Sequence, residues 1–182
     1  GKGFAQKGII DSIKAYFVGK AENFKIHITT AVGDAKSAAK REAETGDKIR
    51  MFACGGEGTV FEVLNGIAGH SNVELGVIPC GSANDFLKFF ESRDNFLDIE
   101  DQVDGEVVYM ALIKAGDNYC LNGCSIGMDA VVARDMSLFK EWPLVSGPLA
   151  YNLAIGVEAE EGNLQMYLSA DQSQKSVVSK IA

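Results

Sequence analysis

Two short glycine-rich loops hold the side chains that could do chemistry in this sequence. The first runs over residues 55–59, where three glycines let the backbone adopt positive φ and approach a phosphate closely. A helix that starts just beyond this loop would add free N–H groups and the positive end of its dipole. The Thr59 hydroxyl could donate a hydrogen bond, and the Glu57 carboxylate could hold Mg²⁺ directly or through water. A plain strand-to-helix turn with a helix-capping threonine explains the same residues equally well.

The second loop repeats this combination of a flexible backbone and polar side chains. Gly81 and Ser82 place a glycine next to a hydroxyl donor, and Asn84 and Asp85 place an amide next to a carboxylate. An Asx turn that caps a following helix is the structural alternative. Because the two loops lie one strand–helix–strand unit apart, a single shared ligand explains them better than two unrelated turns.

The elements that must position these loops alternate between helix and strand. Asp34 is placed to cap a helix, while Gly19 and Gly46 are typical helix-ending residues. Hydrophobic periodicity predicts helices over residues 9–17, 34–43, 60–67 and 86–90, and strands over residues 24–28, 48–54, 74–79, 107–115 and 118–124. This order predicts an α/β fold with a parallel, doubly wound sheet, which binds ligands at the carboxyl ends of its strands.

The pattern changes near residue 100. A turn over residues 115–118 joins two successive strands with no helix between them. We therefore expect a nucleotide-binding α/β domain over residues 1–100 and a second domain, rich in β-structure, over residues 101–182.

Composition restricts the class of protein. Of the 182 residues, 47% are hydrophobic and only three are proline, which indicates a globular chain. A net charge of −8 argues against binding to nucleic acid, because that requires clustered Lys and Arg. Neither a membrane-spanning run nor a signal peptide is evident, so we expect a cytoplasmic location. The four cysteines lack a second Cys or His pair, which favours reduced thiols over a zinc site.

Four motifs, in the same order, resemble those of one enzyme family. Residues 55–66 (GGEGTVFEVLNG) resemble the Gly-Gly-Asp-Gly-Thr…Glu-Val…Asn-Gly signature of diacylglycerol and sphingosine kinases. Residues 79–86 (PCGSANDF) are similar to their Pro-x-Gly-Thr-x-Asn-Asp-Phe, and residues 29–35 and 122–130 to their Thr…Gly-Asp-Ala and Asn…Ser-x-Gly-x-Asp-Ala segments. The first motif also occurs in NAD kinases and phosphofructokinases, whereas the second is much more specific to lipid kinases.

The resemblance implies transfer of the γ-phosphoryl group of ATP to a lipid hydroxyl, with Mg²⁺ near Glu57 and the lipid at a membrane surface. It also implies an NAD-kinase-like doubly wound domain followed by a partial β-sandwich domain. The residues that the resemblance assigns to ATP are Thr29, Gly55, Gly56, Glu57, Gly58, Thr59, Val60, Phe61, Gly81 and Ser82.

Three departures from the family pattern accompany this resemblance. Glu57 stands where the family usually has Asp, and its carboxylate reaches about one bond further toward the metal. An Asn-Pro strand that normally precedes a sequence like residues 1–3 is missing. The family's catalytic base lies in an Asp-Gly-Glu motif after the sandwich, so we expect the catalytic residue beyond Ala182. The same letters at residues 104–106 come before the sandwich, and we interpret them as a turn that enters a strand.

Two other functions fit parts of the sequence. An NAD-kinase-like enzyme for a soluble metabolite shares the first motif but not the second, and a nucleotide-binding pseudo-kinase or regulatory domain would bind without turnover. The acceptor stays open among diacylglycerol, sphingoid bases and undecaprenol-like alcohols. The sequence is also compatible with a homodimer and with a peripheral position at the membrane.

Overall fold

The computed structural model describes residues 4–21, 23–81, 84–90, 94–124, 130 and 177–181. The chain divides into two compact units, and nearly all described residues belong to the first, Gly1–Asn122 with Lys175–Ala182. Its helices are α1 (Phe4–Tyr16), α2 (Asp34–Ala43), α3 (Glu57–Ile67) and α4 (Ile99–Asp104), with short 3₁₀ helices η1 (Asp85–Phe89) and η2 (Asp94–Phe96). Its strands are β1 (Ile49–Gly55), β2 (Val73–Pro79), β3 (Val108–Ala115), β4 (Asn118–Cys120) and β5 (Val177–Ile181).

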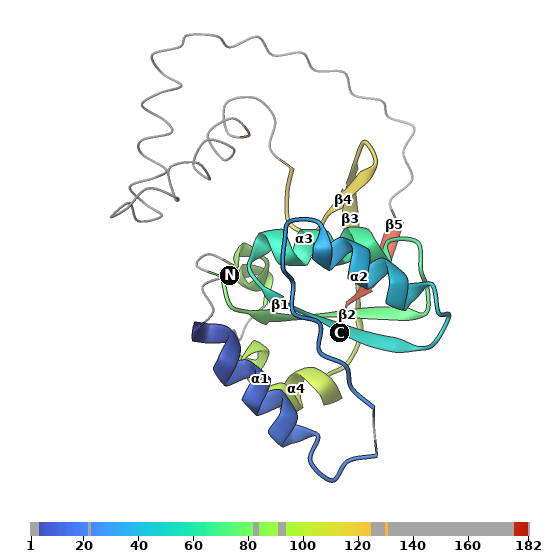
Figure 1. Cartoon of the computed structure of the whole chain (residues 1–182). Helices are drawn as coiled ribbons and strands as arrows, with labels where there is room; N and C mark the ends of the chain where they lie inside the picture. The colour runs from blue at the N-terminus through green and yellow to red at the C-terminus, as the bar shows by residue number, and fades with distance from the viewer. Residues whose placement is uncertain are drawn as a thin grey trace. The chain divides into compact units, whose positions relative to one another are not determined.

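A five-stranded sheet forms the centre of this unit (Figure 1), with the strand order β1-β2-β5-β3-β4. β1 and β2 are parallel, with Ile49 opposite Val73 and Gly55 opposite Pro79. β5 is parallel to β2 and antiparallel to β3, which also pairs antiparallel with β4. The predicted α/β class with a parallel strand pair is confirmed, and the sheet as a whole is mixed.

The hairpin of β3 and β4 shares this sheet with the strands that lead into the two glycine loops. The sequence predicted the hairpin, and the structure confirms it, with Ala115 opposite Asn118. Residues 101–122 cluster with the first unit, because β5 returns from the far end of the chain and links β3 to β2. The predicted sandwich falls on residues outside the described part of the chain and stays a prediction.

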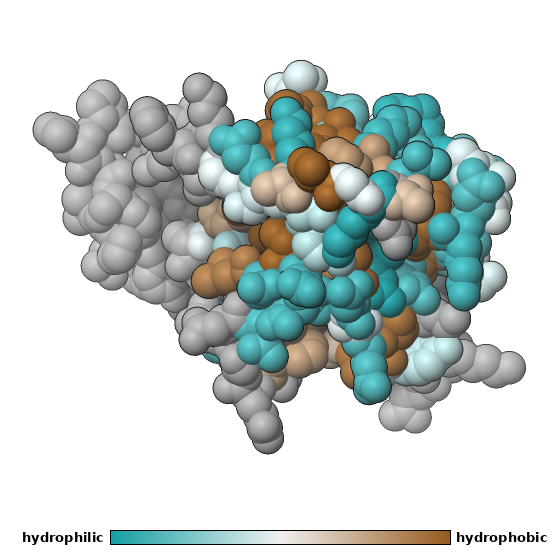
Figure 2. Space-filling view, turned by 90° about the horizontal axis from the view of Figure 1, so that it is seen from below, coloured by the Kyte–Doolittle hydropathy of each residue, from teal (hydrophilic) through white to brown (hydrophobic). Residues whose placement is uncertain are grey.

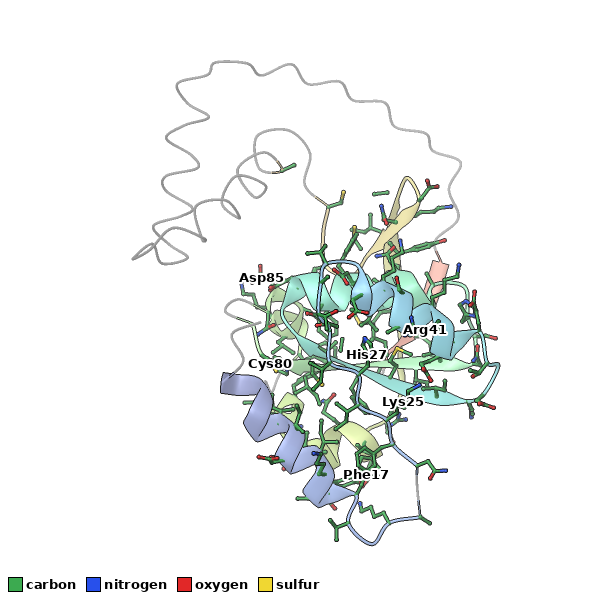
Figure 3. All side chains as sticks on the ribbon, viewed as in Figure 1. Phe17, Lys25, His27, Arg41, Cys80 and Asp85 are labelled. Atoms are coloured by element: carbon green, nitrogen blue, oxygen red, sulfur yellow. The ribbon has the colours of Figure 1, made fainter. Side chains whose placement is uncertain are left out.

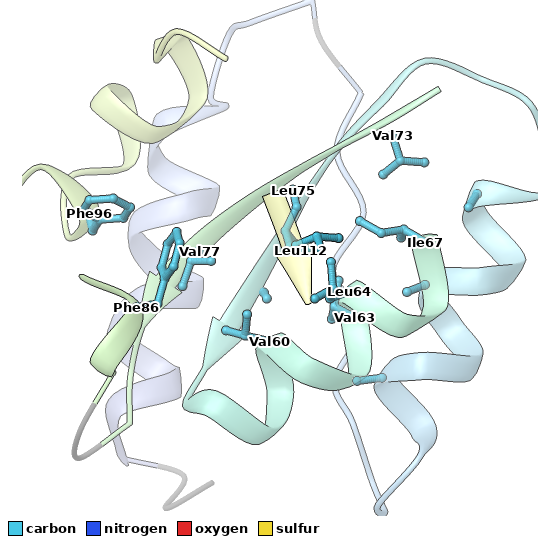
Figure 4. Close-up of a cluster of buried hydrophobic side chains, with 14 of the residues drawn as sticks. Val60, Val63, Leu64, Ile67, Val73, Leu75, Val77, Phe86, Phe96 and Leu112 are labelled. Atoms are coloured by element: carbon cyan, nitrogen blue, oxygen red, sulfur yellow. The ribbon is translucent and has the colours of Figure 1, made fainter. Parts of the chain in front are cut away.

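Helices cover both faces of the sheet. α2 and α3 lie over one face, and α1 and α4 lie over the other (Figure 1). Alternate residues of β1 and β2, Ala53, Leu75 and Val77, join Val63 and Leu64 of α3 in the buried core (Figure 4). This packing fixes the start of α3 over the carboxyl ends of β1 and β2, where the two loops lie.

Arg50, on β1, connects the end of α4 to the sheet. Its guanidinium pairs with Glu74 on β2 at 3.0 Å. The same group donates to the carbonyl oxygens of Val103 and Gly105, where α4 ends. Since carbonyls at a helix end lack intrahelical donors, Arg50 satisfies groups that would otherwise need water.

Small side chains bring α2 and α3 close together. The buried residues of α2 are all alanines: Ala35, Ala38, Ala39 and Ala43. A Cβ added to Gly66 of α3 would lie 2.5 Å from the Lys36 carbonyl oxygen and 2.7 Å from the Ala39 Cβ. Glycine is therefore required here by the close approach of the helices.

Three predicted details are wrong. Residues 23–30 form no strand. Alternating polar and apolar residues suit a strand, but a strand also requires a partner strand with which its backbone can hydrogen-bond. Asp34 does not cap α2, since the N-cap is Gly33 at φ 85° with no side-chain bond, and Asp34 bonds to Thr30. The helix predicted over residues 86–90 is the 3₁₀ helix η1, which begins one residue earlier at Asp85. The glycine ends were correct, with Gly19 at φ 78° and Gly46 at φ 80°.

The surface of the described residues mixes apolar and polar side chains. Seen from below, hydrophilic side chains separate the apolar patches (Figure 2). Large apolar side chains that lie exposed include Val18, Val32 and Tyr109, which are far apart in the sequence. Among the described helices, none is long and apolar enough to cross a membrane.

Replacing Gly66 with Ala should destabilise the fold by about 1–3 kcal/mol, because the methyl group must displace the α2 backbone. The gain in helix propensity, about 1 kcal/mol, offsets only part of this cost. Urea unfolding would measure the change. Gly58→Ala is the matched control, because a Cβ at Gly58 meets no heavy atom within 4 Å. Equal midpoints for the two variants would contradict the close packing of α2 on α3.

Candidate functional site

The first loop is a sharp turn from β1 into α3. Gly56 is the N-cap of α3, in an extended conformation and without a side-chain cap. A Cβ on Gly55 would lie 2.3 Å from the Thr59 Oγ1, so the threonine side chain folds back over the glycine. The helical ladder begins where Val60 N–H donates to the Gly56 oxygen at 3.1 Å. The N–H groups of residues 57–59 precede this ladder and have no intrahelical acceptor.

The second loop packs on the first, backbone against backbone. Cys80 N–H donates to the Gly55 oxygen at 3.0 Å, which extends the β1–β2 ladder past the strand ends. A Cβ on Gly81 would lie 2.5 Å from the Gly56 Cα, closer than real side chains come. The two loops are thus brought together as predicted. Ser82 lies outside the described residues.

Asn84 fixes the shape of the second loop from inside. It adopts the left-handed conformation, with φ 51° and ψ 54°, and it is 8% exposed. Its side-chain amide donates to the Gly81 oxygen at 2.7 Å. No side chain caps η1, so the Asx-cap alternative is wrong, and the Asn84 amide holds the loop together.

A hydrogen bond between Glu57 and Asp85 joins the two loops. The Asp85 N–H donates to Glu57 Oε1 at 2.8 Å, and the Asp85 carboxylate pairs with Lys88 at 2.7 Å. Figure 3 shows Asp85 and Cys80 at the same end of the sheet. Within the part of the chain that the structure describes, no group of three or more His, Cys, Asp or Glu could hold a metal. Because Oε1 accepts the Asp85 N–H, a metal contact at Glu57 would use Oε2.

The predicted residue Thr29 lies in an exposed segment that leads into α2. The next residue, Thr30, donates its N–H to the Asp34 carboxylate at 2.8 Å and its hydroxyl at 3.2 Å. The Thr30 N–H, followed by His27 at 3.2 Å, lowers the pKa of Asp34 from its usual value. No hydrogen bond of the described residues joins Thr29 directly to the glycine loops. The segment that holds Thr29 is linked to the first loop through α3, whose Glu62 bonds to Gly33 and Ala35.

Two polar residues of α3 make connections that the sequence analysis missed. Glu62 accepts the N–H groups of Gly33 and Ala35 at the start of α2, at 2.9 and 3.2 Å. Asn65 pairs with both backbone groups of Tyr119 on β4, at 2.8 and 2.9 Å. Both residues belong to the motif over residues 55–66, but that motif does not identify their partners.

Two thiols lie beneath the loops. Burial raises the pKa of Cys54 to about 12, and the electrostatic effect of the Cys80 thiol adds a smaller increase. Burial also raises the pKa of Cys80. All four cysteines are free thiols, as expected. Neither of these two is suited to nucleophilic chemistry, because the reactive form is the thiolate.

The Asp-Gly-Glu run at residues 104–106 is the turn between α4 and β3, as expected. The Asp104 carboxylate accepts a hydrogen bond from the Tyr16 hydroxyl at 3.2 Å. A Cβ on Gly105 would lie 2.6 Å from the Asp101 oxygen, so a tight turn requires glycine here. These contacts give the run a structural role.

Comparison with known proteins agrees with this arrangement of loops. The model of the diacylglycerol kinase catalytic domain matches residues 1–115, more than half of the chain. The chain belongs to this family. The match includes both glycine loops, the segment around Thr29, and β3.

Individual relatives carry related names. A diacylglycerol kinase of Staphylococcus epidermidis is 32% identical over 127 residues, which cover 69% of this chain and 39% of the relative. One from Bacillus subtilis is 49% identical over 63 residues, covering 34% of this chain and 20% of the relative. Another S. epidermidis protein, provisionally named a lipid kinase, is 28% identical over 148 residues, covering 72% and 48%. The chain spans less than half the length of each relative.

Cys54 should resist alkylation at pH 9 while the protein is folded. Burial raises the pKa of Cys54 to about 12, so very little thiolate is present at pH 9. Iodoacetamide should therefore modify Cys54 at least about tenfold more slowly in the folded protein than in the urea-unfolded chain. Tandem mass spectrometry, which separates Cys54 from Cys80 within one tryptic peptide and Cys124 from Cys120 within another, would measure both rates. Exposed Cys124 serves as the internal control. Similar rates for Cys54 in both states would contradict its burial.

Proposed function

We propose that this chain forms the nucleotide-binding part of an ATP-dependent lipid kinase. The observation that carries the proposal is the contact of Gly56 with Gly81, which joins two glycine loops at the carboxyl ends of β1 and β2. Open α/β sheets bind ligands at this edge. Family membership supports the same chemistry, since relatives are named diacylglycerol kinases.

The loops suit the phosphates of ATP. The N–H groups of residues 57–59 and the positive end of the α3 dipole favour a bound anion. The space next to Gly58 is open, so a phosphate can approach the backbone there. We assign ATP contacts to Thr29, to residues 55–61, and to Gly81 with its neighbour Ser82.

Mg²⁺ would accompany ATP at Glu57. A hard cation prefers oxygen ligands, and Glu57 Oε2 is the oxygen left after Oε1 has accepted the Asp85 N–H. Bound Mg²⁺ supplies neutralisation of the charge that develops during phosphoryl transfer. Glu57 and Asp85 together hold the two loops in position around that charge.

The acceptor would be a lipid hydroxyl presented at a membrane surface, with the protein at the periphery of the membrane. Diacylglycerol is the acceptor that the relatives' names favour. Transfer needs a group that takes the hydroxyl proton, within hydrogen-bond reach of the attacking oxygen. We do not assign that group to Glu57 or Asp85, which join the two loops, or to Asp104, which lies in the α4–β3 turn.

A nucleotide-binding domain without turnover is the second candidate. The observation that favours it is the hydrogen bond from Asp85 N–H to Glu57, which occupies one oxygen of the expected metal ligand. Titration calorimetry with Mg-ATP tests binding, which both candidates require. Radiolabelled phosphate transfer by the full-length protein to diacylglycerol micelles separates them, since only the lipid kinase forms labelled lipid.

Gly58→Ala should weaken Mg-ATP binding by about tenfold or more while leaving the fold intact. The added methyl group meets no protein atom within 4 Å, and Cβ atoms point toward the helix N-terminus, where the phosphate would bind. Calorimetry would measure affinity, and urea unfolding would measure stability. Gly58 is a cleaner test than Gly56, whose Cβ would lie 3.3 Å from the Gly81 Cα. Unchanged affinity in a folded variant would exclude phosphate from the start of α3.

Replacing Glu57 tests the metal assignment. In the full-length enzyme, Glu57→Asp should preserve or raise kcat, because a shorter carboxylate still provides an oxygen ligand. Glu57→Gln should lower kcat by about a hundredfold, because it removes the charge that faces Mg²⁺. Steady-state kinetics at saturating ATP would measure both. If both variants keep the wild-type kcat, Glu57 does not act on the metal.

A further inference from the structure

The carboxylate of Glu62 joins two segments that the proposed function assigns to the nucleotide. Gly33 N–H donates to Oε1 at 2.9 Å, and Ala35 N–H donates to Oε2 at 3.2 Å. Both donors lie at the start of α2, where backbone N–H groups have no intrahelical acceptor. α2 has no side-chain cap of its own, so Glu62 supplies that cap from α3.

The segment over residues 29–33 depends on this cap for its position. Residues 29–32 are exposed, and Val32 is 98% exposed, so burial contributes little to holding them. Asp34 bonds to Thr30, but this contact shapes the segment without tying it to another element. Within the described residues, Glu62 is the side chain of α3 that hydrogen-bonds to this turn.

Glu62 lies on the helix that begins at the glycine loop. Gly56 caps α3, and Glu62 is on its second turn, so a rigid element connects the loop to the carboxylate. The packing of α2 on α3 does not need Glu62, because the alanines of α2 and Gly66 already form that contact. The Glu62 hydrogen bonds therefore act locally, on the turn before α2.

We propose that Glu62 is a positioning residue of the nucleotide site. It holds segment 29–33 at a fixed place relative to the glycine loop, so that both contact one nucleotide as a preformed unit. The proposal rests on the proposed function above. Without the carboxylate, the segment must become ordered on binding, and that cost lowers the affinity.

Glu62→Gln is the test variant, because it keeps the size of the side chain and one acceptor oxygen. Its NH₂ group would face a backbone N–H, which breaks one of the two hydrogen bonds. Affinity for Mg-ATP should fall about tenfold, the size expected for loss of one hydrogen bond to a charged group. Glu62→Asp, which keeps the charge and is shorter, should lose less.

Two measurements on the same samples give the result. Titration calorimetry measures Mg-ATP affinity well below the melting temperature, and hydrogen exchange measures protection of the Gly33 and Ala35 amides without ligand. Glu44→Gln is the matched control, because it removes an exposed carboxylate whose partner is Lys40 at 3.7 Å. Circular dichroism verifies that each variant is folded.

Faster amide exchange together with weaker binding in Glu62→Gln, and neither in Glu44→Gln, supports the proposal. Faster exchange with unchanged affinity overturns it, because Glu62 would then be structural only. Unchanged exchange also overturns it, because the carboxylate would not hold the turn in solution. Absence of Mg-ATP binding by the wild-type chain rejects the proposed function, and this result comes from the wild-type titration alone.

Discussion

The contact between the backbones of Gly56 and Gly81 is the constraint on which the rest of the site depends. It exists because β1 and β2 are parallel neighbours and their ladder continues through the hydrogen bond from Cys80 to Gly55. With no side chain on either glycine, the loops touch at the main chain, because a Cβ on Gly81 would lie 2.5 Å from the Gly56 Cα. Asn84 and Glu57 then hold this arrangement from both sides.

α3 connects this constraint to the remainder of the fold. Its apolar face is buried against the sheet, its N-terminus faces the loops, and Glu62 and Asn65 reach α2 and β4. Both side chains pair with backbone groups in partly buried positions, so their loss would leave partly buried donors or acceptors without a partner. One short helix therefore sets the relative positions of the glycine loop, the Thr29 segment and the hairpin.

Much of this could be predicted from the sequence, because local signals specify local structure. The strands before each loop, the helix after Gly56, and the turn between β3 and β4 follow from periodicity and glycine placement. The strand at residues 24–28 failed because alternation does not reveal whether a partner strand is present. Glu62 and Asn65 were missed because their partners lie on other elements, and no local pattern encodes such pairs. The cap at Asp34 failed because Gly33 takes the N-cap position and the Asp34 carboxylate bonds to Thr30.

The place of β5 in the sheet affects the order in which the protein can fold. β5 lies between β2 and β3, yet it is synthesised after both. A chain emerging from the ribosome can form β1, α3 and β2 early, but one edge of β2 stays open until the far end of the unit is made. Open strand edges favour pairing with other chains, and contacts between distant residues form slowly. The protein should therefore gain more from chaperones during synthesis than its short loops and helices suggest.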